Sequence, residues 1–213
     1  MSGKFLNNFC LLSLMLLVTL VCGCSRESGP NIQAGAYEVI DDQGTRVMLA
    51  HKPTRILTLA MGLDSIVLGM LPEDRLIAVN ALADDPASSN IVTKAQKIQR
   101  KIKNPSAEEV LALKPDLVFV YNWGKAEIVD NLRELGIKTI VVKGPKSIND
   151  VKDNIKTIAG GIGEAAKGTQ LIAMMDTKLS EIKTKIDNIK PEERKKIVLI
   201  SLMTSYGGKG CTF

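Results

Sequence analysis

Short apolar runs alternate with amphipathic segments along the chain from about residue 55 onward. The runs have the length of β-strands, and in the segments between them apolar residues recur every three or four positions, which is typical of helices. Strands that alternate with helices of about ten residues predict right-handed βαβ crossovers, and therefore an α/β fold with a doubly wound, mainly parallel sheet. The predicted strands are residues 55–60, 76–80, 116–121 and 138–142, with a weaker one at 97–98. The predicted helices are residues 63–71, 106–113, 126–135 and 147–159.

Local signals indicate where some elements begin and end. Residues 37–40 and 46–49 are rich in β-forming residues, and Gly44 lies in the loop between them. Glycine supplies the positive φ of hairpin connections, so an N-terminal β-hairpin is predicted ahead of the alternating part. Ser106 and Glu109 have the spacing of a helix capping box, which places a helix start at this point.

A longer helix is predicted at residues 164–189, and Pro191 ends it. Its apolar residues recur at spacings of three and four, which gives the helix one apolar face: Leu171, Met174, Met175, Leu179, Ile182, Ile186 and Ile189. A further strand is predicted at residues 196–202. A long helix that leads to a lone strand indicates a second lobe that has only begun.

The first residues have the pattern of a secretory signal peptide. Lys4 supplies a positive charge, and residues 9–21 are almost wholly apolar. This run is shorter than the roughly twenty residues that span a bilayer as a helix. We therefore predict that residues 1–23 are a signal peptide that is removed, with an N-terminal membrane anchor as the alternative.

The end of that segment resembles a bacterial lipobox. Within residues 21–25, Gly23 places a small residue directly before Cys24, whereas bulky Val21 precedes Cys22. Cys24 is therefore predicted to be acylated and to become the new N-terminus, and several acyl chains on one residue give stable anchoring. Residues 24–36 are rich in Ser, Gly, Pro and Asn, as expected for a flexible tether.

Composition argues against several classes of function and of site. The chain has 213 residues and a formal net charge of +5, and its charges are interspersed, which argues against a nucleic-acid partner. Of its four cysteines, Cys10 and Cys22 leave with the signal peptide and Cys24 is acylated, so Cys211 has no partner for a disulfide. His51 is the only histidine and cannot build a zinc or manganese site by itself. No resident metal or cofactor is expected.

The sequence also disfavours an enzyme. The glycines of residues 160–163 and Gly168 resemble a phosphate-binding loop, but no Lys precedes Thr169, and the segment joins two predicted helices instead of following a strand. No nucleophile–base pairing is visible in the sequence. We therefore expect binding without chemistry.

Several segments together resemble a known family. Residues 42–44, 52–57, 104–118 and 135–137 appear in the order and with the composition of a group of periplasmic substrate-binding proteins. This group binds iron siderophores and cobalamin, and its members are the receptor components of ABC importers. The resemblance covers residues 37–213, and the segment Asn-Pro-Ser…Leu-Lys-Pro-Asp-Leu within residues 104–118 is its most specific part.

The resemblance implies two α/β lobes joined by one long helix, with the ligand held between the lobes. Residues 37–163 would form the N-terminal lobe, residues 164–190 the connecting helix, and residues 191–213 the start of the C-terminal lobe. Most of a second lobe is missing from the sequence, so we expect that it is either a fragment or a product with half of the binding cleft.

The function implied is that of a lipid-anchored receptor in the cell envelope, either on the outer face of the cytoplasmic membrane or in the periplasm. It would capture an iron chelate (a siderophore or haem) or cobalamin and deliver it to an ABC permease, while a separate subunit hydrolyses ATP. Binding of another metal complex is an alternative. A structural or interaction surface lipoprotein without a small ligand is another.

Candidate ligand-binding residues follow from the fold, because ligands of open α/β sheets lie outside the carboxyl ends of the strands. Trp123 follows one strand end directly and offers an apolar face and one N–H donor, although it could instead be a packing residue at the sheet rim. The candidate set is Met61, Leu82, Asn122, Trp123 and Tyr206. Core packing is the alternative for Met61 and Leu82.

Glu108 is a candidate for a different contact. In the family it resembles, a carboxylate at the matching place docks onto basic residues of the permease. The alternative is an acid that favours the start of a helix through the macrodipole. Asp64 is interpreted only in this second way, as a helix-start acid.

Overall fold

The computed structural model describes residues 35–123 and 126–195. Within them, five strands form a parallel sheet in the order β5–β4–β3–β6–β7. The strands are β3 (Ile56–Thr58), β4 (Leu76–Asn80), β5 (Lys101–Ile102), β6 (Leu117–Tyr121) and β7 (Thr139–Val142). This is the doubly wound order of α/β proteins, so the predicted fold class is confirmed.

Helices cover both faces of the sheet. On one face are α2 (Met61–Met70), α6 (Ile148–Gly161) and the first half of α7 (Ala165–Asp187), which pack on residues such as Phe119 and Ile140. On the other are α4 (Ala107–Ala112) and α5 (Ala126–Glu134), which pack on alternate residues such as Val118 and Val141. Every residue of β6 is buried, as its continuous apolar run predicted. The short helices are α3 (Val92–Ala95), η1 (Glu73–Arg75) and η2 (Pro191–Glu193).

The predicted strand at residues 97–98 is wrong. The amide of Ile98 donates to the carbonyl of Ala95, so the turn that follows α3 continues through this segment. Ile98 is buried in the core as part of that turn. The edge strand begins three residues later, where Lys101 pairs with Val79.

The predicted N-terminal hairpin is confirmed as β1 (Tyr37–Ile40) paired antiparallel with β2 (Arg46–Leu49). Asp41 in its turn is buried and accepts hydrogen bonds from the amides of Gln43 and Thr45, at 2.9 and 2.8 Å. The same carboxylate forms an ion pair of 2.7 Å with Arg133 on α5. The hairpin is thereby fixed to the α/β lobe.

Two of the motifs that carry the family resemblance hold each other in place. The Asp116 carboxylate accepts hydrogen bonds from the amides of Thr54 and Arg55, which lie just before β3. The Arg55 guanidinium in turn donates to the carbonyls of Lys114 and Leu113 at the end of α4. This latch lies at the amino ends of the central strands β3 and β6, so the motifs serve the fold at this point.

Glycines at the end of α6 and the start of α7 allow these helices to pack closely. A Cβ on Gly161 would lie 2.8 Å from Cδ1 of Ile140 and 2.9 Å from Cζ of Phe119, so the helix can approach the sheet only with glycine at this position. A Cβ on Gly168 would lie 2.4 Å from the Cβ of Ala159, at the contact between α6 and α7. These glycines pack helices and do not follow a strand, unlike those of a phosphate-binding loop.

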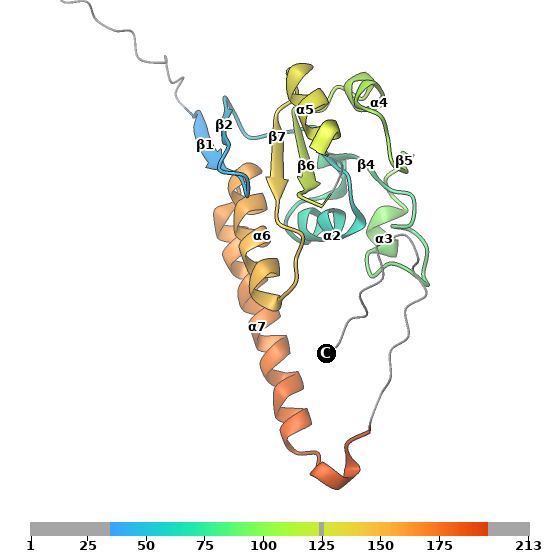
Figure 1. Cartoon of the computed structure of the whole chain (residues 1–213). Coiled ribbons are helices and arrows are strands. Elements are labelled where there is room, and N and C mark those ends of the chain that lie inside the picture. The colour runs from blue at the N-terminus through green and yellow to red at the C-terminus, as the bar shows by residue number, and fades with distance from the viewer. Residues whose placement is uncertain (1–34, 124–125, 196–213) are drawn as a thin grey trace, which may run out of the picture. The chain divides into compact units, whose positions relative to one another are not determined.

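The long helix is confirmed, but only part of its apolar face is covered. Leu171, Ile172 and Met175 pack against the core of the lobe. Figure 1 shows α7 continuing past α6, and in this second half Ile182 and Ile186 are exposed among the residues that the structure describes.

Candidate functional site

The strand order places a switch point between β3 and β6. These central strands are neighbours, yet the helices that follow them lie on opposite faces, α2 on one and α5 on the other. In open α/β sheets, ligands bind at the carboxyl ends of the strands beside such a point. Residues 58–64, 80–85 and 121–123, which end or follow β3, β4 and β6, are called the carboxyl edge below.

Two aromatic residues stand at this edge. The rings of Tyr121 and Trp123 are tilted by 46° with their centroids 4.4 Å apart. Tyr121 is only 8% exposed, whereas Trp123 is 60% exposed. The indole also lies against Gly144, because a Cβ there would be 2.3 Å from its Cε3 atom. Trp123 therefore has one supported side and one side open to solvent, unlike a buried packing residue.

Tyr121 extends this pair toward the start of α2. A Cβ on Gly62 would lie 2.8 Å from the Tyr121 hydroxyl oxygen, so only glycine leaves room for the hydroxyl there. Burial raises the pKa of Tyr121, and the nearby Asp64 carboxylate raises it further. The tyrosine hydroxyl is therefore neutral and lies against the first turn of the helix. Sequence reasoning missed Tyr121, although its place at the end of a buried strand was a signal for it.

Asp64 is fully buried at the centre of the edge. One carboxylate oxygen is hydrogen-bonded to the Thr58 hydroxyl at the end of β3, and the other accepts the Asn80 amide at the end of β4, at 2.8 Å. Burial raises the pKa of Asp64 to about 7, against the hydrogen bonds from Thr58 and Asn80 and the charge of Lys101, which lower it. Asp64 does lie in the first turn of α2. The interpretation as a helix-start acid alone missed that it joins two strand ends.

Met61 and Leu82 lie after neighbouring strands of this edge. Met61 begins α2, is half-buried and packs against the core. Leu82 is 53% exposed, and its amide donates to the Asn80 side chain at 3.0 Å. Leu82 therefore presents an apolar side chain to solvent on a loop that Asn80 holds.

Both polar atoms of the Asn122 side-chain amide form hydrogen bonds. Its nitrogen donates to the Asp42 carboxylate at 2.7 Å, and its oxygen accepts the Gly144 amide at 2.9 Å. The residue ties the hairpin turn and the loop after β7 to the carboxyl edge. Because Gly144 supports the Trp123 ring, this arrangement favours a positioning role for Asn122.

Glu108 is exposed on α4, on the face of the sheet opposite α6 and α7. The capping box is formed by its neighbour, since the Glu109 carboxylate accepts the Ser106 amide at 2.7 Å. The Ser106 hydroxyl lowers the pKa of Glu108, so the side chain is charged at neutral pH. Two other predicted residues, Cys24 and Tyr206, lie outside the described residues, as does the predicted strand at 196–202.

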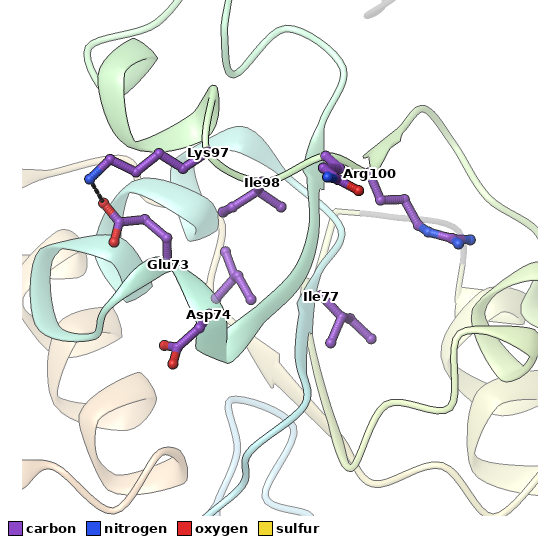
Figure 2. A pocket seen from close by; sticks show the side chains of 8 residues that line it. Glu73, Asp74, Ile77, Lys97, Ile98 and Arg100 are labelled. Atoms are coloured by element: carbon purple, nitrogen blue, oxygen red, sulfur yellow. Dashed lines mark hydrogen bonds and ion pairs between the residues drawn. The ribbon is translucent and has the colours of Figure 1, made fainter.

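Two grooves lie at the opposite end of the sheet. A groove of about 700 Å³ is lined by residues that precede β4 and β5, and a neighbouring one of about 540 Å³ includes Arg55 and Lys114. Figure 2 shows the first groove, where Lys97 forms an ion pair of 2.9 Å with Glu73. Both belong to what is called the amino edge below: residues 53–55, 73–77, 97–100 and 112–115.

Two general features of the described residues complete the site. No group of three or more His, Cys, Asp or Glu side chains that could hold a metal ion occurs among residues 35–123 and 126–195. In the same part of the chain, no helix has the length and apolar character needed to cross a membrane.

Comparison with known proteins identifies the class. The chain belongs to the periplasmic binding protein family, whose description matches residues 65–210. It is 25% identical over 197 residues to an ABC transporter substrate-binding lipoprotein of Bacillus subtilis, covering 88% of this chain and 61% of that protein. It is 27% identical over 136 residues to a vitamin B12-binding protein of Vibrio vulnificus, covering 63% of this chain and 48% of that one.

Another relative is a probable siderophore-binding lipoprotein of Bacillus subtilis, 26% identical over 184 residues, with 81% of this chain and 54% of that protein covered. The chain thus spans about half of the length of these relatives. Among solved structures, the haem-binding protein HmuT has the same fold, with a TM-score of 0.61 and 23% identity over 75% of this chain and 51% of that one. The predicted family resemblance is confirmed.

Proposed function

We propose that this chain is a lipid-anchored substrate-binding receptor of an ABC importer that captures an iron chelate (a siderophore or haem) or cobalamin. The observation that carries the proposal is the Tyr121–Trp123 pair at the switch point, with one indole face exposed. No Lys or Arg occurs directly after β3, β4 or β6, in residues 59–61, 81–83 and 122–123. An apolar and aromatic surface of this kind suits a corrinoid or porphyrin ring better than an anionic siderophore.

The receptor would bind and deliver without chemistry of its own, and the chelate would be its cargo. We place it in the cell envelope, anchored through Cys24 to the outer face of the cytoplasmic membrane or held in the periplasm. Relatives named as ABC transporter and siderophore-binding lipoproteins support this placement. Residues 37–163 would form the N-terminal lobe and α7 the connecting helix.

The ligand is tested by titrating the purified chain with cyanocobalamin, haemin and ferrioxamine while recording the fluorescence of Trp123, the only tryptophan. We expect saturable quenching by cyanocobalamin or haemin. Because the chain spans about half of its relatives, we expect affinity in the micromolar range or weaker. Equilibrium dialysis of Trp123→Ala separates loss of signal from loss of binding. Absence of binding for all three probes would contradict the proposal and favour an interaction lipoprotein.

Docking to the permease is tested at Glu108, whose exposed charge would meet a cation of the membrane subunit. Glu108→Arg should weaken association with the importer's permease complex in nanodiscs and leave cyanocobalamin or haemin binding unchanged, with the largest effect at low salt. Asp153→Arg on α6 is the matched control, since it makes the same charge change on the other face of the sheet. Equal association of the Glu108 variant at low salt would contradict the docking role.

Anchoring is tested by metabolic labelling with a palmitate analogue. Cys24→Ser should abolish lipid labelling and leave an unprocessed precursor, whereas Cys22→Ser should be labelled normally. Normal labelling of the Cys24 variant would show that the acylation site is elsewhere.

A further inference from the structure

Two strand ends are hydrogen-bonded to one buried carboxyl group at the carboxyl edge, and a third strand end lies near it. Asp64 is hydrogen-bonded to Thr58 at the end of β3 and accepts the amide of Asn80 at the end of β4. Tyr121, at the end of β6, contacts the same turn of α2 through Gly62. The first turn of α2 is therefore the common support of the parts of the edge that follow β3, β4 and β6.

The groups that face Asp64 are few. From β6 comes the Tyr121 hydroxyl, which burial keeps neutral. From β5 comes Lys101, whose ammonium donates to the carbonyls of Ala95 and Ile98 at 2.7 and 2.6 Å and lies 3.3 Å from the Asp84 carboxylate. Thr58 and Asn80 contribute hydrogen bonds without charge. Because Lys101 is already engaged by Asp84 and by the carbonyls at the end of α3, no cation among the described residues forms an ion pair with Asp64.

Two exposed side chains depend on this arrangement. The backbone amide of Asn80 donates to Asp64, and the side-chain oxygen of Asn80 accepts from the backbone amide of Leu82. Tyr121, which lies against the turn that carries Asp64, supports the Trp123 ring. A change of charge at Asp64 would therefore act on Leu82 through β4 and on Trp123 through β6. The pKa of Asp64, about 7, places such a change within the physiological range.

We propose that Asp64 is the positioning residue of the carboxyl edge: as a neutral acid it holds Leu82 and the Tyr121–Trp123 pair in place, and loss of its proton displaces them. In the structure the Thr58 hydroxyl donates to Asp64; neutral Asp64 would donate its proton to that hydroxyl once the hydroxyl hydrogen turns away, while its other oxygen accepts from the backbone amide of Asn80. Ionised Asp64 accepts from the Thr58 hydroxyl and the Asn80 backbone amide, but it is a buried charge without a cation in contact, which favours opening of the edge toward water. The consequence for cargo, which rests on the proposed function, is weaker binding at higher pH.

The first test needs no ligand. Trp123 fluorescence of the purified chain is recorded from pH 5 to pH 9. We expect one transition centred near pH 7 that is absent in Asp64→Asn, because asparagine reproduces the neutral acid: its oxygen accepts from Asn80 and its nitrogen donates to Thr58. The control is His51→Gln, which removes the only histidine of the sequence, and this variant should keep the transition. A wild-type signal that is flat over this range, or a transition that Asp64→Asn retains, overturns the proposal.

A second variant guards against misfolding of Asp64→Asn. Thr58→Val is close in shape and removes a hydrogen bond that lowers the pKa of Asp64. It should move the fluorescence midpoint upward by about half to one pH unit. An unchanged or lower midpoint in a folded Thr58→Val chain would count against Asp64 as the titrating group.

Cyanocobalamin binding at pH 6 and pH 8 then tests the coupling. We expect the wild type to bind about three- to tenfold more weakly at pH 8, and Asp64→Asn to bind equally at both. A wild type that binds with equal affinity at both overturns the coupling. If the fluorescence transition is present but neither cyanocobalamin nor haemin binds at any pH, the proposed function fails while the role of Asp64 in positioning the edge is supported.

Discussion

The surroundings of the acidic residues differ between the two edges of the sheet, and they shift the pKa in opposite directions. At the carboxyl edge Asp64 is fully buried, and burial raises its pKa. At the amino edge Glu73 is half-buried beside the exposed Lys97, and the hydrogen bond from Lys97 lowers the pKa of Glu73. Asp64 therefore favours its neutral form, whereas Glu73 favours its charged form. Asp64 is hydrogen-bonded to the ends of two strands, and Glu73 to one neighbouring lysine.

This difference shows that cavity volume alone does not mark a binding site. The amino edge has the groove of about 700 Å³, but its charged residues are of both signs, and Glu73 is already paired with the exposed Lys97 (Figure 2). The carboxyl edge combines a supported aromatic face, glycines that make room for it and a buried polar group. Such convergence of apolar surface with a few fixed polar groups is what binding sites share.

The largest effect is expected on the pH dependence of stability. The pKa of Asp64 is about 7 in the fold and 3.8 ordinarily, so between these values the folded chain holds a proton that the unfolded chain has lost. This contribution lowers stability as pH rises from about 4 to about 7 and is constant above. Asp64→Asn should gain on the wild type over that range, reaching on the order of 4 kcal/mol at most. Urea denaturation at several pH values measures this, and a difference that does not vary with pH would contradict it.

Truncation of the aromatic face should act on binding more than on folding. Trp123→Ala should cost about 1–3 kcal/mol in affinity for cyanocobalamin or haemin, as for an aromatic anchor. Because the side chain is 60% exposed, the free energy of unfolding should change by less than about 1 kcal/mol. Leu111→Ala is the control, since it removes an exposed apolar side chain from α4. Early melting of Trp123→Ala with normal binding would show that the ring packs the fold instead.

Gly144, which lies against the Trp123 ring, can be changed while the ring itself is kept. A methyl group at Gly144 would overlap Trp123, so Gly144→Ala should displace the indole and shift its emission. The loss of affinity should be smaller than for Trp123→Ala, about 1 kcal/mol, because the apolar surface remains although its placement is lost. Gly160→Ala separates this overlap from a general effect of glycine replacement, since a Cβ there would meet only Cγ2 of Val39, at the ordinary contact distance of 3.9 Å. Unchanged emission of Gly144→Ala would place the ring elsewhere.

Features that depend on local sequence could be predicted, whereas features that depend on neighbours in space could not. The hairpin, the capping box and the buried strand β6 depend on local patterns, and all three are confirmed. The edge strand was misplaced because pairing of Lys101 with Val79 is decided by a neighbour in space. Asp64 has the spacing of any helix-start acid, and its burial and its hydrogen bonds to β3 and β4 depend on neighbours in space. The exposed face of Trp123 likewise depends on Gly144, from the loop after another strand.

The smallest effect is expected at the amino edge, where Arg100 is exposed and lines both grooves. Arg100→Ala should change stability by less than about 0.5 kcal/mol, because isolated surface charges contribute little. It should also leave cyanocobalamin and haemin binding unaltered, since the residue precedes β5 and lies at the opposite end of the sheet from Trp123. Isothermal titration of this variant beside Trp123→Ala compares the edges directly. A loss of affinity for Arg100→Ala equal to that of Trp123→Ala would move the site to the groove, and cavity volume would then have been the better guide.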